Sequence, residues 1–105
     1  MPFSSLFSWW RRRPAAKLSH LRFLVYTRRG CHLCDDAWQL LNEERQRRGF
    51  ILEAVDVDTD PALVALYGKE VPVVTVDGQV RFRGVVNRVL LARLLRAEAE
   101  RSQSP

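Results

Sequence analysis

Residues 21–34, LRFLVYTRRGCHLC, decide the fold of this chain. The first seven are apolar and rich in side chains that favour strands, and Arg-Arg-Gly follows them, so they predict a buried strand that ends in a turn. Cys31 and Cys34 come directly after this turn. Apolar residues then recur at helical spacing, at Leu33, Ala37, Leu40 and Leu41. Because Gly49 follows two arginines, the pattern predicts an amphipathic helix that ends at this glycine.

The remainder of the chain predicts three further strands and two helices. Residues 50–57 predict a second strand, which completes a right-handed βαβ unit. An Asp-Pro start and a closing glycine predict a short helix over residues 60–68. Residues 71–76 and 80–83 predict an antiparallel hairpin, because an Asp-Gly turn signal lies between them. Asn87 is a candidate N-cap for a last helix, so the predicted order is βαβαββα, an α/β domain.

Length and composition indicate one globular domain. The chain has 105 residues, of which 47% are hydrophobic and 28% charged. We expect a tail at residues 1–20, the domain over residues 21–101 and a frayed end at residues 102–105. The length excludes a multidomain enzyme, and no apolar run reaches the roughly 20 residues that a membrane-spanning helix needs. A domain of this size folds without a disulfide framework or a structural metal, so its two cysteines are available for chemistry.

Positive charge is concentrated in the tail. The formal net charge is +5, from 17 Lys and Arg against 12 Asp and Glu. Four of the cationic residues lie at Arg11, Arg12, Arg13 and Lys17, which leaves 13 of the 17 against the 12 acidic residues. Since the domain itself is nearly neutral, we expect no nucleic-acid partner.

The tail permits two interpretations. Its apolar residues precede its arginines, which is opposite to the order in a secretory signal, and we therefore expect a cytoplasmic protein. These apolar residues are Phe3, Leu6, Phe7, Trp9 and Trp10. The first interpretation is a disordered extension, or a segment ordered only by packing on the domain. The second is contact of residues 1–17 with a membrane surface, where aromatic side chains insert and arginines meet anionic lipid.

The spacing of the two cysteines predicts a redox-active pair. Unpaired backbone N–H groups and the dipole at the start of a helix stabilise a thiolate, which predicts Cys31 as the nucleophile. Cys34 lies one helical turn further on the same face, within reach to attack a mixed disulfide on Cys31. His32 is either a modulator of the thiolate near neutral pH or an exposed spacer.

Other interpretations of the cysteines stay open at this point. The two residues could be inert or form a static disulfide, although a CxxC between a strand and a helix favours redox chemistry. A metal site could combine them with His32 or His20. Structural zinc takes four ligands, and the sequence has no second CxxC, so we expect no metal ligands.

Several motifs together resemble a known family. They are Cys31-His32-Leu33-Cys34 after LRFLVYT, Val71-Pro72 before a strand and an Asp-Gly hairpin, and Gly84 ahead of the last helix. In this combination, residues 21–97 resemble the glutaredoxin-like members of the thioredoxin fold, and more narrowly the small bacterial proteins with a C-H-L-C active site. The resemblance implies a thioredoxin-like fold, with a four-stranded mixed sheet flanked by three helices.

The resemblance also implies roles for residues outside the CxxC motif. Pro72 would follow a cis peptide bond and lie against the cysteines, with His32 and Leu33 modulating the site. The backbone of Val71 would pair with an incoming peptide or with glutathione. Two residues are implied to hold glutathione: Arg28 stands where a lysine meets its glycyl carboxylate, and Asn87 lies near its γ-glutamyl end.

The sequence departs from the glutaredoxin pattern at several positions. The usual CPYC is CHLC here, and Glu70 replaces the threonine that normally precedes Val-Pro. Glu70 would repel an anionic ligand if its side chain faced the groove. The sequence also departs from thioredoxin proper, which disfavours that assignment: Gly30 precedes the motif, and Val25 stands where thioredoxins carry a buried acid.

The function that follows is that of a monomeric thiol–disulfide oxidoreductase. It would reduce protein disulfides or glutathione mixed disulfides through Cys31 and Cys34, with no bound cofactor. Glutathione, as reductant or co-substrate, and a thioredoxin reductase are the candidate partners for its own reduction. The alternatives are a metal or iron–sulfur carrier, with ligands from glutathione or a second subunit, and a binding module without catalysis.

Overall fold

The computed structural model describes residues 17–103, and the expectations for residues 1–16 lie outside this range. Its elements are β1 (Arg22–Thr27), α2 (His32–Arg48), β2 (Ile51–Asp56), the 3-10 helix η1 (Val57–Thr59), α3 (Pro61–Tyr67), β3 (Val73–Val76), β4 (Gln79–Arg83) and α4 (Arg88–Gln103). The order of strands and α-helices is βαβαββα, as the sequence predicts. None of the described helices is both long and apolar enough to cross a membrane.

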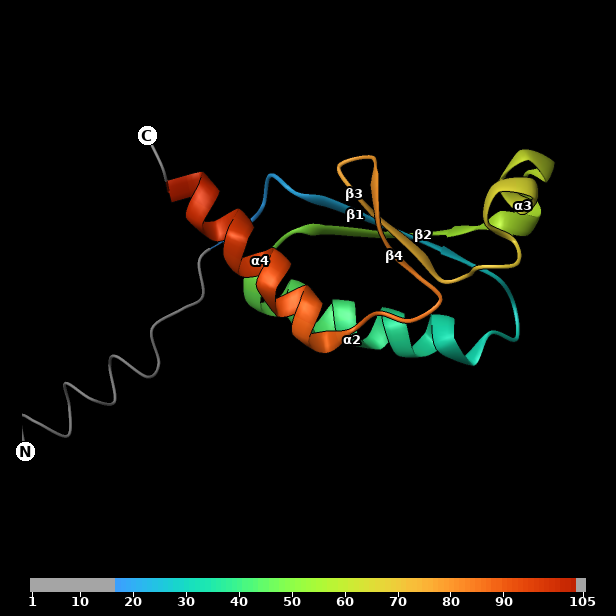
Figure 1. Ribbon diagram of the computed structural model, residues 1–105, viewed down its shortest axis with the longest axis horizontal. Helices are drawn as coiled ribbons and strands as arrows, with labels where there is room; N and C mark the ends of the chain where they lie inside the picture. Colours follow the sequence, from blue (N-terminus) through green and yellow to red (C-terminus); the bar gives the residue numbers. More distant parts are fainter. Residues whose placement is uncertain (1–16, 104–105) are drawn as a thin grey trace, which may run out of the picture.

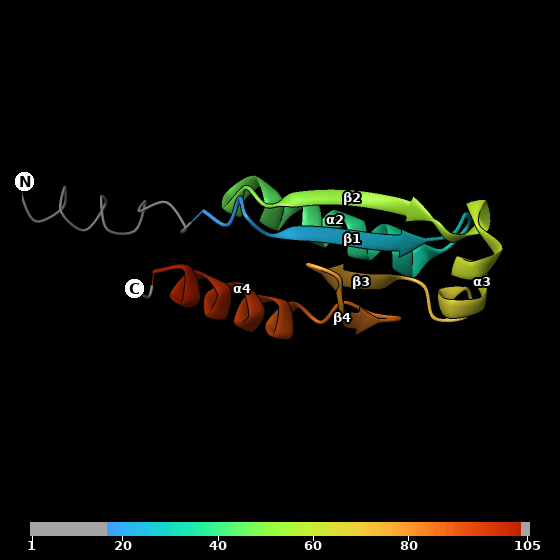
Figure 2. The same cartoon turned by 90° about the horizontal axis from the view of Figure 1, so that it is seen from above.

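The strands form one mixed sheet in the order β2-β1-β3-β4, as Figure 2 shows. β1 and β2 are parallel, with Phe23 opposite Leu52, because α2 connects them across one face. β3 runs antiparallel to both β1 and β4, and the β3–β4 hairpin has a register shift at Val74/Thr75. The four-stranded mixed sheet with three α-helices confirms the thioredoxin-like fold.

The core lies between α2, α4 and one face of the sheet, on the side that both helices cover in Figure 1. Alternate residues of β1, Phe23 and Val25, are fully buried on this face. The helices contribute apolar residues at helical spacing to the same cluster, among them Ala37, Leu40, Leu41, Leu91, Leu94 and Leu95. α3 lies apart from this layer, at the end of the sheet where β1 and β2 finish.

The packed structure extends beyond the expected limits of residues 21–101. Leu18 is fully buried in the core, and its backbone N–H donates to the carbonyl of Arg48 over 2.7 Å. At the other end, α4 continues to Gln103. Residue 18 therefore contributes to the folded domain, although the sequence places it in the tail.

The third strand is shorter than its apolar run predicts. The run begins at Val71, whereas β3 begins at Val73. The intervening peptide bond between Val71 and Pro72 is cis, and proline has no N–H to donate to a strand partner. The first two residues of the run therefore form a loop beside the cysteines instead of a strand.

Candidate active site

Cys31 is the N-cap of α2. The backbone N–H of Cys34 donates to Cys31 Sγ over 3.1 Å, so the sulfur satisfies one of the N–H groups that a helix start leaves unpaired. A thiolate at this position is stabilised by the same N–H group and by the helix dipole. Gly30 has a φ of +74°, a left-handed conformation that favours glycine at the turn before Cys31.

The two cysteines differ in their access to solvent. Their sulfurs are joined in a disulfide, with the Cα atoms 5.2 Å apart. Cys31 is partly exposed, whereas Cys34 is only 3% exposed, one turn inside the helix. A large partner can therefore reach Cys31 but not Cys34.

The loop before β3 lies against the motif. Cys31 Sγ is 3.9 Å from the carbonyl oxygen of Val71, and Pro72 beside it is buried. The N–H of Gly84 donates to the carbonyls of Pro72 (2.8 Å) and Glu70 (3.0 Å), which ties this loop to the end of β4. Within residues 17–103, the N–H and carbonyl groups of Val71 have no backbone partner, so both can pair with an extended segment beside Cys31.

Comparison with known proteins decides the family. The family model described as "Glutaredoxin-like domain (DUF836)" matches residues 22–96, which include the CxxC motif and the Val-Pro loop. The chain belongs to the glutaredoxin-like family.

Solved structures agree with this assignment. The solution NMR structure of protein Ne2328 from Nitrosomonas europaea matches this glutaredoxin-like chain with a TM-score of 0.62 and 25% identity, over 70% of this chain and 89% of that one. The X-ray structure of the target protein XcR50 from X. campestris matches with a TM-score of 0.58 and 33% identity, over 71% of this chain and 96% of that one. Among curated proteins, no match was found.

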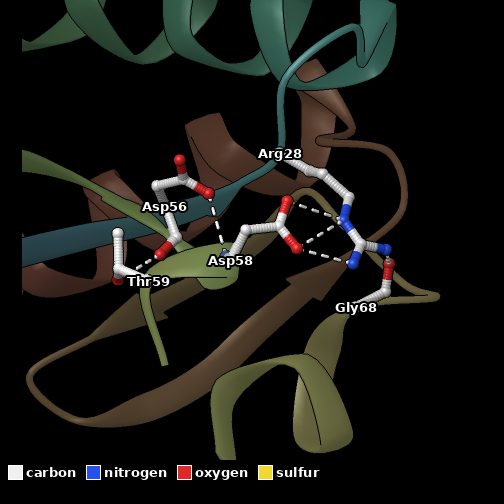
Figure 3. Close-up of polar contacts among 5 residues, drawn as sticks. All are labelled: Arg28, Asp56, Asp58, Thr59 and Gly68. Atoms are coloured by element: carbon white, nitrogen blue, oxygen red, sulfur yellow. Dashed lines mark hydrogen bonds and ion pairs between the residues drawn. The ribbon is translucent and has the colours of Figure 1, made fainter. Parts of the chain in front are cut away.

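Arg28 of this glutaredoxin-like protein is engaged with its own chain (Figure 3). Its Nη2 lies 2.7 Å from Oδ1 of Asp58, its Nε donates to both carboxylate oxygens, and its Nη1 donates to the carbonyl of Gly68 over 3.2 Å. The pKa of Arg28 is raised above its ordinary value. The hydrogen bond with Asp58 is the largest cause, and the negative charge of Asp58 is the second. The same hydrogen bond lowers the pKa of Asp58. A glutathione carboxylate would have to compete with Asp58 for this guanidinium.

Glu70 is also paired within the chain. Its carboxylate forms an ion pair with Arg83, whose guanidinium carbon lies 5.9 Å from the centre of the Tyr67 ring. The Tyr67 ring in turn packs against Tyr26, with ring centres 4.7 Å apart. The negative charge of Glu70 is therefore offset by a neighbouring cation at the edge of the site.

The other sequence-predicted residues lie around the motif with different roles. His32 and Leu33 are exposed, on the first turn of α2. Asn87 caps α4, because its Oδ1 accepts from the N–H groups of Val89 (2.9 Å) and Leu90 (3.0 Å). The side-chain oxygen of Asn87 therefore already accepts hydrogen bonds from the first turn of α4.

A small cavity lies behind the buried cysteine. Its lining includes Cys34, Asp35 and Trp38 of α2, with Thr27 and Arg28 from the end of β1 and the following loop. Trp38 and Cys34 therefore line the same cavity. In the part of the chain described here, no three His, Cys, Asp or Glu side chains are grouped to hold a metal ion.

Sequence reasoning missed one element of the site, the partner of Arg28. Asp58 lies 30 residues away in η1, and only the meeting of two loops brings the pair together. The sequence does show an acidic segment, DTD at residues 58–60, after the second strand. No local pattern connects this segment to Arg28.

Proposed function

We propose that this protein is a thiol–disulfide oxidoreductase that reduces disulfide substrates through Cys31 and Cys34. The observation that carries the proposal is the asymmetric pair: a partly exposed Cys31 caps α2, and a buried Cys34 lies within bonding distance behind it. Membership of the glutaredoxin-like family supports the same chemistry.

The reaction proceeds in two thiol–disulfide exchanges. The Cys31 thiolate attacks one sulfur of the substrate disulfide, a bond forms between the two sulfurs, and the other substrate sulfur leaves as a thiolate. Cys34 then attacks Cys31 Sγ, so that the Cys31–Cys34 disulfide forms and the second substrate thiolate leaves. Two electrons pass to the substrate, and its two thiolates take up the two protons that the cysteines have lost.

The chain around the cysteines supports each exchange. The Cys34 N–H and the dipole of α2 stabilise the attacking Cys31 thiolate. The free backbone groups of Val71 hold an extended substrate segment beside Cys31 Sγ, which aligns its disulfide for attack. Burial keeps Cys34 away from bulk substrate, so that its nearest sulfur target is the mixed disulfide on Cys31.

A dithiol that has been oxidised must be reduced before the next cycle. A low-molecular-weight thiol such as glutathione, or a thioredoxin reductase system, would supply the two electrons and two protons. A reducing compartment such as the cytoplasm would provide either reductant.

Trapping of the mixed disulfide tests the proposal. In Cys34→Ser, the first exchange proceeds but the second cannot, so mass spectrometry should find one substrate thiol bound to Cys31. Cys31→Ser is the matched control and should bind none. Absence of an adduct in Cys34→Ser, with the reduced protein folded, would overturn the proposal.

A further inference from the structure

A groove runs from the active-site motif along α2. Its volume is about 240 Å³, and its walls include Leu33, Asp36, Ala37, Leu40, Val85 and Arg88. Leu33 stands between the two cysteines in the sequence, so one end of the groove adjoins the site. Leu33 is 46% exposed and Val85 is 62% exposed, which places apolar surface in contact with water beside Cys31.

The groove is lined by one carboxylate, that of Asp36, and one guanidinium, that of Arg88. Arg88 faces Glu43, with Nη1 4.0 Å from Oε2. Within residues 17–103, Asp36 and its neighbour Asp35 form no ion pair, and both are exposed. The groove thus combines an apolar floor with an unpaired carboxylate at its edge.

This combination disfavours glutathione as the molecule that occupies the groove. Glutathione has two carboxylates and one ammonium group, and hence a net negative charge at neutral pH. The guanidinium of Arg28 is held by Asp58, and the side-chain oxygen of Asn87 is held by the start of α4. A cationic or neutral segment with an apolar side chain matches the groove better, by charge complementarity.

We propose that this groove receives an apolar side chain next to the reactive cysteine of a polypeptide substrate, and that Asp36 favours a basic residue beside it. The groove then selects polypeptide disulfides over glutathione disulfides. The inference rests on the proposed function, since the groove acts only on substrates that Cys31 attacks. The backbone of Val71, whose carbonyl oxygen lies 3.9 Å from Cys31 Sγ, would pair with the same polypeptide segment.

Single-turnover rates of the reduced full-length protein test this selection. The substrates are three cysteine peptides that differ only in the two residues beside the cysteine (Leu-Lys, Leu-Glu and Gly-Gly), and glutathione. Each is presented as a mixed disulfide with thionitrobenzoate, whose release is followed by absorbance. Rates are divided by the rate with the mixed disulfide of 2-mercaptoethanol and thionitrobenzoate, whose 2-mercaptoethanol part is neutral and too small to fill the groove.

We expect the Leu-Lys peptide to react about two- to fivefold faster than Leu-Glu, the effect of one exposed ion pair. Leu-Lys should exceed Gly-Gly by about tenfold, the usual effect of a seated apolar group. Glutathione should react slowest of the four. Asp36→Lys should reverse the order of the Leu-Lys and Leu-Glu peptides.

Two substitutions separate the apolar wall of the groove from general effects of a polar replacement. Val85→Ser should remove most of the advantage of Leu-Lys over Gly-Gly, because it shortens the apolar wall without adding charge. Val89→Ser is the matched control, since Val89 is 61% exposed and does not line the groove, and it should leave this advantage unchanged.

The outcomes distinguish this inference from the proposed function. Equal normalised rates for all substrates, glutathione as the fastest substrate, an unchanged order in Asp36→Lys, or an unchanged advantage of Leu-Lys over Gly-Gly in Val85→Ser would overturn the groove proposal while the oxidoreductase proposal stands. If the protein reduces none of the five disulfides faster than Cys31→Ser, the proposed function itself fails.

Discussion

Arg28 forms a forked ion pair with Asp58, with Nη2 2.7 Å from Oδ1 and Nε 3.0 Å from Oδ2. The same guanidinium donates to the carbonyl of Gly68 at the end of α3. Because Arg28 precedes Cys31 by three residues and Gly68 precedes Val71 by three, this contact joins the two loops that meet at Cys31 Sγ. We propose that Arg28 positions these two loops.

Loss of this contact should slow substrate reduction. We expect Arg28→Ala to lower the rate about three- to tenfold, less than the roughly hundredfold that a 1 Å misplacement of reacting groups can cost. Arg28→Lys should recover only part of the rate, because lysine has no planar fork for the carboxylate. A steady-state assay would measure both variants, and full activity in Arg28→Ala would show that the loops hold their positions without it.

The ion pair also predicts a dependence of stability on pH. The pKa of Asp58 is lowered in the folded protein by its hydrogen bond with Arg28. Its contribution to stability is therefore fully present above the unfolded pKa of about 3.9 and is lost as the pH falls through the lower folded pKa. The melting temperature of Asp58→Asn should fall below that of the wild type at pH 6, and the difference should shrink towards pH 2. A difference that does not change with pH would contradict this assignment.

Local sequence signals predicted the fold and the close approach of Cys31 and Cys34, whereas they did not predict contacts between distant loops. The strand before Cys31 and the N-cap at Asn87 follow from residues a few positions apart, and both occur. The pairing of Arg28 with Asp58 depends on how a 3-10 helix meets the loop after β1, which no short segment encodes. The burial of Leu18 was not predicted for a similar reason. A single apolar residue among polar neighbours has no periodicity, and its burial depends on residues of the core cluster that are distant in the sequence.

Asn87 should affect stability more than catalysis. Removal of the capping oxygen in Asn87→Ala should cost about 1 kcal/mol of unfolding free energy, measured by urea denaturation. Asn87→Asp keeps an accepting oxygen and should stay close to the wild type. If Asn87→Ala is as stable as the wild type but reacts more slowly with glutathione disulfides, this residue would instead be assigned to ligand binding.

Leu18 should behave as a core residue. We expect Leu18→Ala to cost about 2–5 kcal/mol of unfolding free energy, as for other buried leucines, and a chain that begins at residue 21 to lose at least as much. Lys17→Ala, at the neighbouring exposed position, should change stability by less than about 0.5 kcal/mol. Denaturation midpoints would compare the stability of the three variants with that of the wild type. A small effect of Leu18→Ala would contradict the assignment of Leu18 to the core.

Thr75 offers a stabilising substitution. It is 3% exposed in β3, and its Oγ1 has no hydrogen-bond partner among the described residues. Replacement of an unpaired buried hydroxyl by a methyl group removes a desolvation cost, so Thr75→Val should gain about 1 kcal/mol in unfolding free energy. Thr75→Ser keeps the hydroxyl and should lose stability. If Thr75→Val is the less stable protein, the hydroxyl has a partner in solution.

The reduction potential of the Cys31–Cys34 pair, measured by equilibration of the full-length protein in a series of glutathione redox buffers, tests whether the pair is a catalytic dithiol. The fraction of the Cys31–Cys34 disulfide would be measured by the mass added on thiol alkylation. We predict one reversible two-electron transition at roughly −200 to −270 mV, the range of glutaredoxins and thioredoxin. A pair that stays oxidised well below this range, or that does not re-form its disulfide after reduction, would contradict a catalytic dithiol.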